Sequence, residues 1–161
     1  MPEMTLLGWF HTILGVLAVL SGFYTLYKYR VISYDVSSGK FYILVTLLVA
    51  GSALGIYNQG GFGVAHILAV LTLMALADGY IMERYKWFGS FSKYFQALGY
   101  TSTLLFHMIP AITDFLRRLP VGDTFIDSFE DPLLLNFHLA FLIIYVVGMI
   151  AQLIWLKRQA V

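Results

Sequence analysis

Long apolar stretches separated by short polar segments dominate the sequence. Five of these stretches approach the roughly 20 apolar residues that a helix needs to cross a bilayer. They cover about Thr5–Tyr27, Lys40–Tyr57, Phe62–Met82, Tyr94–Leu116 and Leu133–Leu156. The pattern predicts an all-α integral membrane helix bundle of five transmembrane helices, with residues 1–161 forming a single membrane domain.

Two prolines refine these boundaries. Pro132 is expected to open the fifth helix, because a missing N–H costs nothing in the first helical turn. Pro110 falls inside the fourth helix and predicts a kink. The first residues, MPEMT, lack the basic region of a signal peptide, so we expect the first apolar segment to be retained as a helix.

Composition supports a membrane protein. Hydrophobic residues make up 60% of the chain and charged residues 12%, whereas a soluble domain carries about a quarter charged residues. The mean hydropathy is +0.79. The chain contains no cysteine, which excludes disulfides, thiolate metal sites and cysteine nucleophiles. Its basic residues form no nucleic-acid-binding patch, so no nucleic-acid partner is expected.

The lysines and arginines predict an orientation. With five spans, the side opposite the N-terminus receives Lys28, Arg30, Lys40, Arg84, Lys86, Lys93, Lys157 and Arg158. The N-terminal side receives only Arg117 and Arg118. Because basic loops stay in the cytoplasm, we expect an outside N-terminus and a cytoplasmic C-terminus in a bacterial inner (plasma) membrane.

The histidines are the strongest candidates for chemistry. His11, His66 and His138 each lie a few residues inside a helix that starts on the outer side, at a depth of roughly 6–9 Å. His107 lies deeper, near the bilayer centre. Neutral imidazole is a common ligand of zinc, copper and iron, and two imidazoles on opposite faces hold haem b. The pattern predicts a site for haem b or a transition-metal ion such as zinc; buried histidines that only form hydrogen bonds are the alternative.

Three other polar residues leave two interpretations open. Asp114 could pass protons near His107 or pair with a neighbouring arginine at the helix end. Tyr145 shares a helix face with His138 and Gln152, which predicts either a proton path or simple hydrogen bonds between helices. Asp78 lies in the cytoplasmic half of the third helix, where pairing with a basic residue is favoured over a protonatable site.

Two short motifs resemble a family of small bacterial multi-helix membrane proteins known as a domain of unknown function. Its patterns are F-G-x-x-H at the start of the third helix and H-R-x-x-G-R-x-Y-V at the start of the second. The matching residues are Phe62, Gly63 and His66 for one motif, and Gly39, Lys40, Tyr42 and Ile43 for the other. Asp35 and Val36 stand where the pattern has His-Arg. The resemblance covers roughly residues 5–120 and implies no established activity; more distantly, the architecture resembles bacterial cytochrome b bundles.

Three functions follow from these patterns. The first is binding of haem b or a metal ion through His11, His66, His138 and His107, with electron exchange with quinone. The second is a non-enzymatic accessory subunit of a larger membrane complex, or a homo-oligomer. The third is a membrane zinc hydrolase that uses Asp114 as acid or base. Whether the chain is an enzyme stays open.

Overall fold

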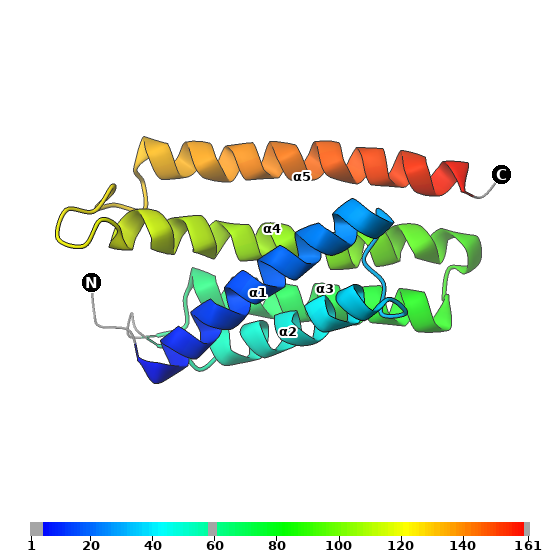
Figure 1. The fold of residues 1–161 in the computed structure, drawn as a ribbon, viewed down its shortest axis with the longest axis horizontal. Helices are drawn as coiled ribbons and strands as arrows, with labels where there is room; N and C mark the ends of the chain where they lie inside the picture. Colours follow the sequence, from blue (N-terminus) through cyan, green and yellow to red (C-terminus); the bar gives the residue numbers. More distant parts are fainter. Residues whose placement is uncertain (1–4, 58–60, 160–161) are drawn as a thin grey trace.

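The computed structural model describes residues 5–57 and 61–159 as helices joined by short connections (Figure 1). The five α-helices are α1 (Leu6–Tyr29), α2 (Ser37–Ala53), α3 (Val64–Tyr85), α4 (Ser92–Arg118) and α5 (Pro132–Arg158), and a 3-10 turn, η1 (Gly89–Phe91), precedes α4. The all-α prediction is confirmed for this part of the chain. Residues 1–4, which suggested a retained first helix, lie outside it.

Local capping explains several helix ends. Thr5 caps α1 by accepting a hydrogen bond from the backbone N–H of Gly8 at 3.1 Å. Arg30 ends α1 in the left-handed conformation, with φ of 66°. Asp131 accepts from the N–H of Leu133 at 2.8 Å, and Pro132 occupies the first turn of α5 as predicted.

Helix α2 differs most from the sequence prediction. It begins at Ser37 rather than Lys40 and ends at Ala53 rather than Tyr57. The prediction followed apolar residues alone, but the polar first turn is helical: the N–H of Lys40 donates to the carbonyl of Val36 at 2.8 Å. The last turn ends near Gly55, whose flexible backbone weakens a helix.

Three helices are long and apolar enough to cross a membrane: α1, α3 and α5. Helix α2 is apolar but has only 17 residues. Helix α4 has 27 residues but carries serines, threonines and a histidine that lower its hydropathy. The sequence and structure thus support a membrane protein with three candidate spanning helices.

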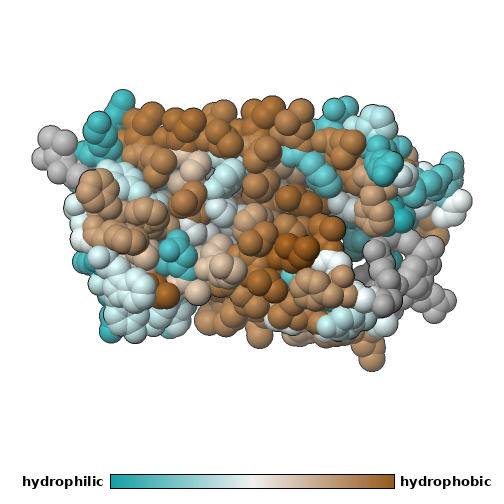
Figure 2. Space-filling view, turned by 180° about the vertical axis from the view of Figure 1, so that it is seen from behind, coloured by the Kyte–Doolittle hydropathy of each residue, from teal (hydrophilic) through white to brown (hydrophobic). Residues whose placement is uncertain are grey.

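Helices that follow one another in the sequence pack against each other. Helix α1 lies against α2, α3 lies against α4, and α5 packs mainly along α4 (Figure 1). Figure 2 shows the opposite face, where hydrophobic side chains form an almost unbroken row along α5 and hydrophilic residues gather mainly toward the two ends. A helix that is apolar on nearly all sides suits contact with lipid.

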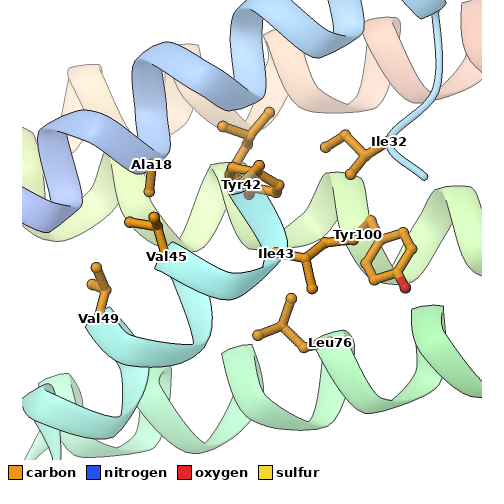
Figure 3. Packing of buried hydrophobic residues seen from close by; sticks show 9 residues of the cluster. Ala18, Ile32, Tyr42, Ile43, Val45, Val49, Leu76 and Tyr100 are labelled. Carbon is orange, nitrogen blue, oxygen red and sulfur yellow. The ribbon is translucent and has the colours of Figure 1, made fainter. Parts of the chain in front are cut away.

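The main apolar core lies between α1, α2, α3 and α4. Figure 3 shows Ala18 of α1 beside Val45 of α2, and Leu76 of α3 near Ile43. Tyr42 and Tyr100 are fully buried in the same cluster. Each of them also makes a side-chain hydrogen bond, so the apolar core contains a few paired polar groups.

The segment between α4 and α5 packs back onto the helix ends through its apolar residues. Ile126 is 3% exposed and lies in a cluster with Leu116 and Leu134. Phe125 stacks on Phe115, with ring centroids 6.1 Å apart. The segment therefore covers the ends of α4 and α5 on the side where α1 begins.

Candidate functional site

The polar row of α5 is paired with hydroxyl groups of α4. His138 Nε2 lies 3.2 Å from Thr113 Oγ1, and the Tyr145 hydroxyl lies 2.7 Å from Ser102 Oγ. Gln152 accepts from Thr101 Oγ1 at 3.0 Å. Of the two interpretations of this row, the geometry favours hydrogen bonds between helices, with Tyr145 bound to one serine rather than joined to His138 or Gln152.

His107 belongs to a second set of hydrogen bonds, between α2 and α4. Its Nε2 lies 3.1 Å from Thr46 Oγ1, and the ring is 7% exposed. One turn away, the buried hydroxyls of Tyr42 and Thr103 bond to each other. Both pairs join an α2 side chain to an α4 side chain, so they fix the register of these two helices.

His11 ties α1 to α2. Its Nδ1 lies 3.1 Å from both the Val49 carbonyl oxygen and Ser52 Oγ. Because a carbonyl can only accept, Nδ1 carries the proton and Nε2 keeps its lone pair. This tautomer, with Nδ1–H on a carbonyl, is also the one that metal-bound histidines adopt.

His66 lies in an aromatic pocket at the start of α3. Its ring centroid is 4.7 Å from that of Tyr57 and 5.1 Å from that of Phe62. Its Nδ1 accepts from the N–H of Gly63 at 3.1 Å, which caps the helix. The proton is therefore on Nε2, which is buried and has no hydrogen-bond partner among the residues that the structure describes. A neutral imidazole with this proton arrangement offers no free lone pair to a metal.

The four histidines do not form one cluster. His11 and His107 both bond to the Thr46–Ser52 stretch of α2. His66 instead bonds to Gly63 at the start of its own helix, and His138 bonds to Thr113 of α4. Within residues 5–57 and 61–159, no three histidine, aspartate or glutamate side chains meet in an arrangement that could hold a metal ion.

Asp114 pairs with an arginine. Its carboxylate lies 3.5 Å from Arg118 Nε, one helical turn away, and about half of the Asp114 side chain is exposed. This is the simpler of its two predicted roles. Asp78 makes no salt bridge in the described part of the chain; its carboxylate lies where α3 approaches Gly99 of α4.

Glu83 is an organising residue that the sequence reasoning did not single out. Its carboxylate accepts from the Tyr34 N–H at 2.9 and 3.1 Å and from the Tyr100 hydroxyl at 3.0 Å. The Ser33 hydroxyl donates to it as well. Glu83 thus joins the end of α3, the α1–α2 connection and α4. The sequence signal that could have indicated this role is an acidic residue at the end of an apolar helix, together with a polar loop whose backbone N–H groups need acceptors.

A groove of about 780 Å³ opens between α1, α4 and α5. Most of its lining is apolar, with Phe23 and Leu26 from α1, Leu104 and Met108 from α4, and Phe141 and Ile144 from α5. Arg30 and Trp155 lie at one end. No histidine lines the groove.

Comparison with known proteins finds no matching family model, no similar curated protein and no similar solved structure. The resemblance to the family with the F-G-x-x-H motif stays a prediction.

Proposed function

We propose that the chain is a five-span protein of a bacterial inner membrane and a non-enzymatic accessory subunit of a larger membrane complex. The observation that carries this proposal is the pairing of its core polar side chains. His11, His107 and His138 each bond to a neighbouring helix. These groups hold the bundle together, so the chain offers other molecules mainly its apolar helix faces and short loops.

Five spans are supported by the placement of α4. It runs back along both α3 and α5 (Figure 1), and its 27 residues reach ~40 Å at 1.5 Å per residue. If α3 and α5 cross the bilayer, α4 crosses it between them. Its polar residues face neighbouring helices, where they are hydrogen-bonded, and such residues are tolerated inside a membrane bundle. By the same reasoning, α2 spans because it packs between α1 and α3.

Single cysteines test the topology, because the natural chain has none. Ser128→Cys lies in the exposed α4–α5 segment and Ser90→Cys in the exposed α3–α4 connection. A membrane-impermeant maleimide added to intact cells should label the first variant and reach the second only after permeabilisation. Labelling of Ser90→Cys in intact cells would contradict the orientation, and labelling of both would contradict the crossing of α4.

The subunit role is tested by the native size of the protein. Extracted from its own membrane in mild detergent, the 18.2 kDa chain should migrate in a larger assembly with at least one other chain in fixed stoichiometry. Re-extraction at high salt is the control for loose association. Migration as a monomer, or only with copies of itself, would contradict the proposal.

A second candidate function, binding of haem b or a metal ion, rests on His11. Its Nδ1–H donates to a backbone carbonyl and leaves Nε2 as a potential ligand, and His107 bonds to the same helix, α2. This pair replaces the set of His11, His66 and His138 as the first choice. Electron exchange with quinone would follow only from a bound haem. A zinc hydrolase is weaker, because Asp114 is paired with Arg118.

A further inference from the structure

The length of the groove between α1, α4 and α5 is close to the thickness of one bilayer leaflet. It extends along α5 from Phe141 to Trp155. These residues are 155 − 141 = 14 positions apart, which is ~21 Å along a helix. Half of a bilayer, including its headgroups, measures roughly 20–22 Å. A molecule with a long apolar chain and a polar head at the Arg30 end would fit these dimensions.

The polar groups along the groove already have partners. Thr101 donates to Gln152, whose amide donates to the carbonyl oxygen of Arg30. The Ser102 hydroxyl donates its only proton to the carbonyl of Leu98 at 2.7 Å. Tyr145 must therefore donate its own proton to Ser102. The hydroxyls thus have no free proton for a ligand such as a quinone, whose carbonyl oxygens need donors.

The guanidinium of Arg30 is different. No residue in 5–57 or 61–159 accepts a hydrogen bond from it or pairs with it as an acid. Its backbone is fixed, because its N–H donates to Leu26 at 2.9 Å and its carbonyl accepts from Gln152. The nearby acid Glu83 is already bound to Ser33 and Tyr34. Lys157 and Arg158 add positive charge at the end of α5.

We propose that this groove binds one anionic phospholipid of the cytoplasmic leaflet. An acyl chain lies along the apolar lining, and the phosphate accepts hydrogen bonds from Arg30 beside Trp155. Arginine presents a planar fork of donors that matches phosphate geometry, and aromatic residues such as Trp155 favour the headgroup level. The inference rests on the proposed membrane placement but not on the accessory-subunit role.

Lipid retention measured by native mass spectrometry tests the groove. Delipidated protein in mild detergent is given phosphatidylglycerol or phosphatidylcholine with identical acyl chains. The natural chain should retain one phosphatidylglycerol per chain, with about tenfold preference over phosphatidylcholine, as expected for a charge-assisted contact. Arg30→Gln should remove the preference, and Arg30→Lys should keep part of it. Gly148 lines the groove, and nothing lies within 4 Å of a Cβ added there, so a larger side chain fits into the open space. Gly148→Leu should therefore fill part of the groove and lower the retention of both lipids.

Arg158→Gln is the matched control, since it removes one positive charge at the same end but does not line the groove. It should retain phosphatidylglycerol like the natural chain. Equal retention of the two lipids, or equal loss in Arg30→Gln and Arg158→Gln, would overturn the proposal. Displacement of the lipid by inorganic phosphate would indicate an ion site instead, and retention of added ubiquinone in its place would indicate a quinone site. Unexpected cysteine labelling would refute the membrane orientation, whereas unselective lipid retention with the expected labelling would refute only this groove.

Discussion

Replacing Glu83 by alanine should lower the free energy of unfolding by about 3 kcal/mol, because it removes the acceptor of three donor groups at once. The Tyr34 N–H, the Ser33 hydroxyl and the Tyr100 hydroxyl all point at this carboxylate. At roughly 2–4 °C per kcal/mol for a chain of this size, the midpoint of thermal unfolding in detergent should fall by about 6–12 °C. The α1–α2 connection should also become more sensitive to proteolysis.

Asp35→Ala is the matched control for Glu83→Ala. Asp35 is an exposed acid in the same connection, and its carboxylate accepts no hydrogen bond from the described residues. Its removal should change stability by less than about 0.5 kcal/mol, as is usual for surface substitutions. Glu83→Gln should fall between the two, because it keeps an acceptor oxygen but turns an amide N–H toward donors. Equal effects of Glu83→Ala and Asp35→Ala would show that Glu83 does not organise this end.

Gly99→Ala should destabilise the bundle by about 2–3 kcal/mol, because one added methyl group collides with backbone. A Cβ at Gly99 would lie 2.7 Å from the Ala75 carbonyl oxygen and 2.8 Å from the Gly79 nitrogen. Both atoms belong to α3 and cannot move away as a flexible side chain could. The expected result is a lower unfolding midpoint, caused by separation of α3 and α4.

The control for Gly99 is Gly51→Ala on α2, where a Cβ would meet nothing within 4 Å. Alanine favours helix over glycine by up to ~1 kcal/mol, so this substitution should be neutral or stabilising. The two variants make the same chemical change, but only Gly99→Ala should lower stability. A loss of stability in both would indicate that glycine flexibility matters rather than the close approach of α3 and α4.

The helices could be predicted from the sequence because the apolar stretches are long and their ends carry clear signals. Pro132 marked the start of α5 correctly. The start of α2 was missed because its first turn, from Ser37 to Lys40, is polar. Hydrophobicity alone does not separate a polar helical turn from a loop.

The histidine partners could not be predicted, because depth in a membrane says nothing about rotation around a helix axis. His11, His66 and His138 were expected at similar depth, yet each has a different partner: α2 for His11, its own helix start for His66 and α4 for His138. His11 and His107 both bond to α2, although the depth argument had placed them apart. The role of Glu83 was missed because its donors are mostly backbone and hydroxyl groups of a distant loop.

The central claim is the proposal that His11, His107 and His138 join helices through hydrogen bonds rather than serve as ligands of a metal or haem. Elemental analysis of the purified protein in mild detergent tests it most directly, because iron, zinc and copper are counted together and haem contributes its iron. We expect less than about 0.1 metal ion per chain, in the natural chain and in His11→Gln and His107→Gln alike, because the proposal assigns both imidazoles to hydrogen bonds with α2. About one metal ion per chain, or one per two chains, that is lost in either variant would contradict the claim and establish the site at His11 and His107.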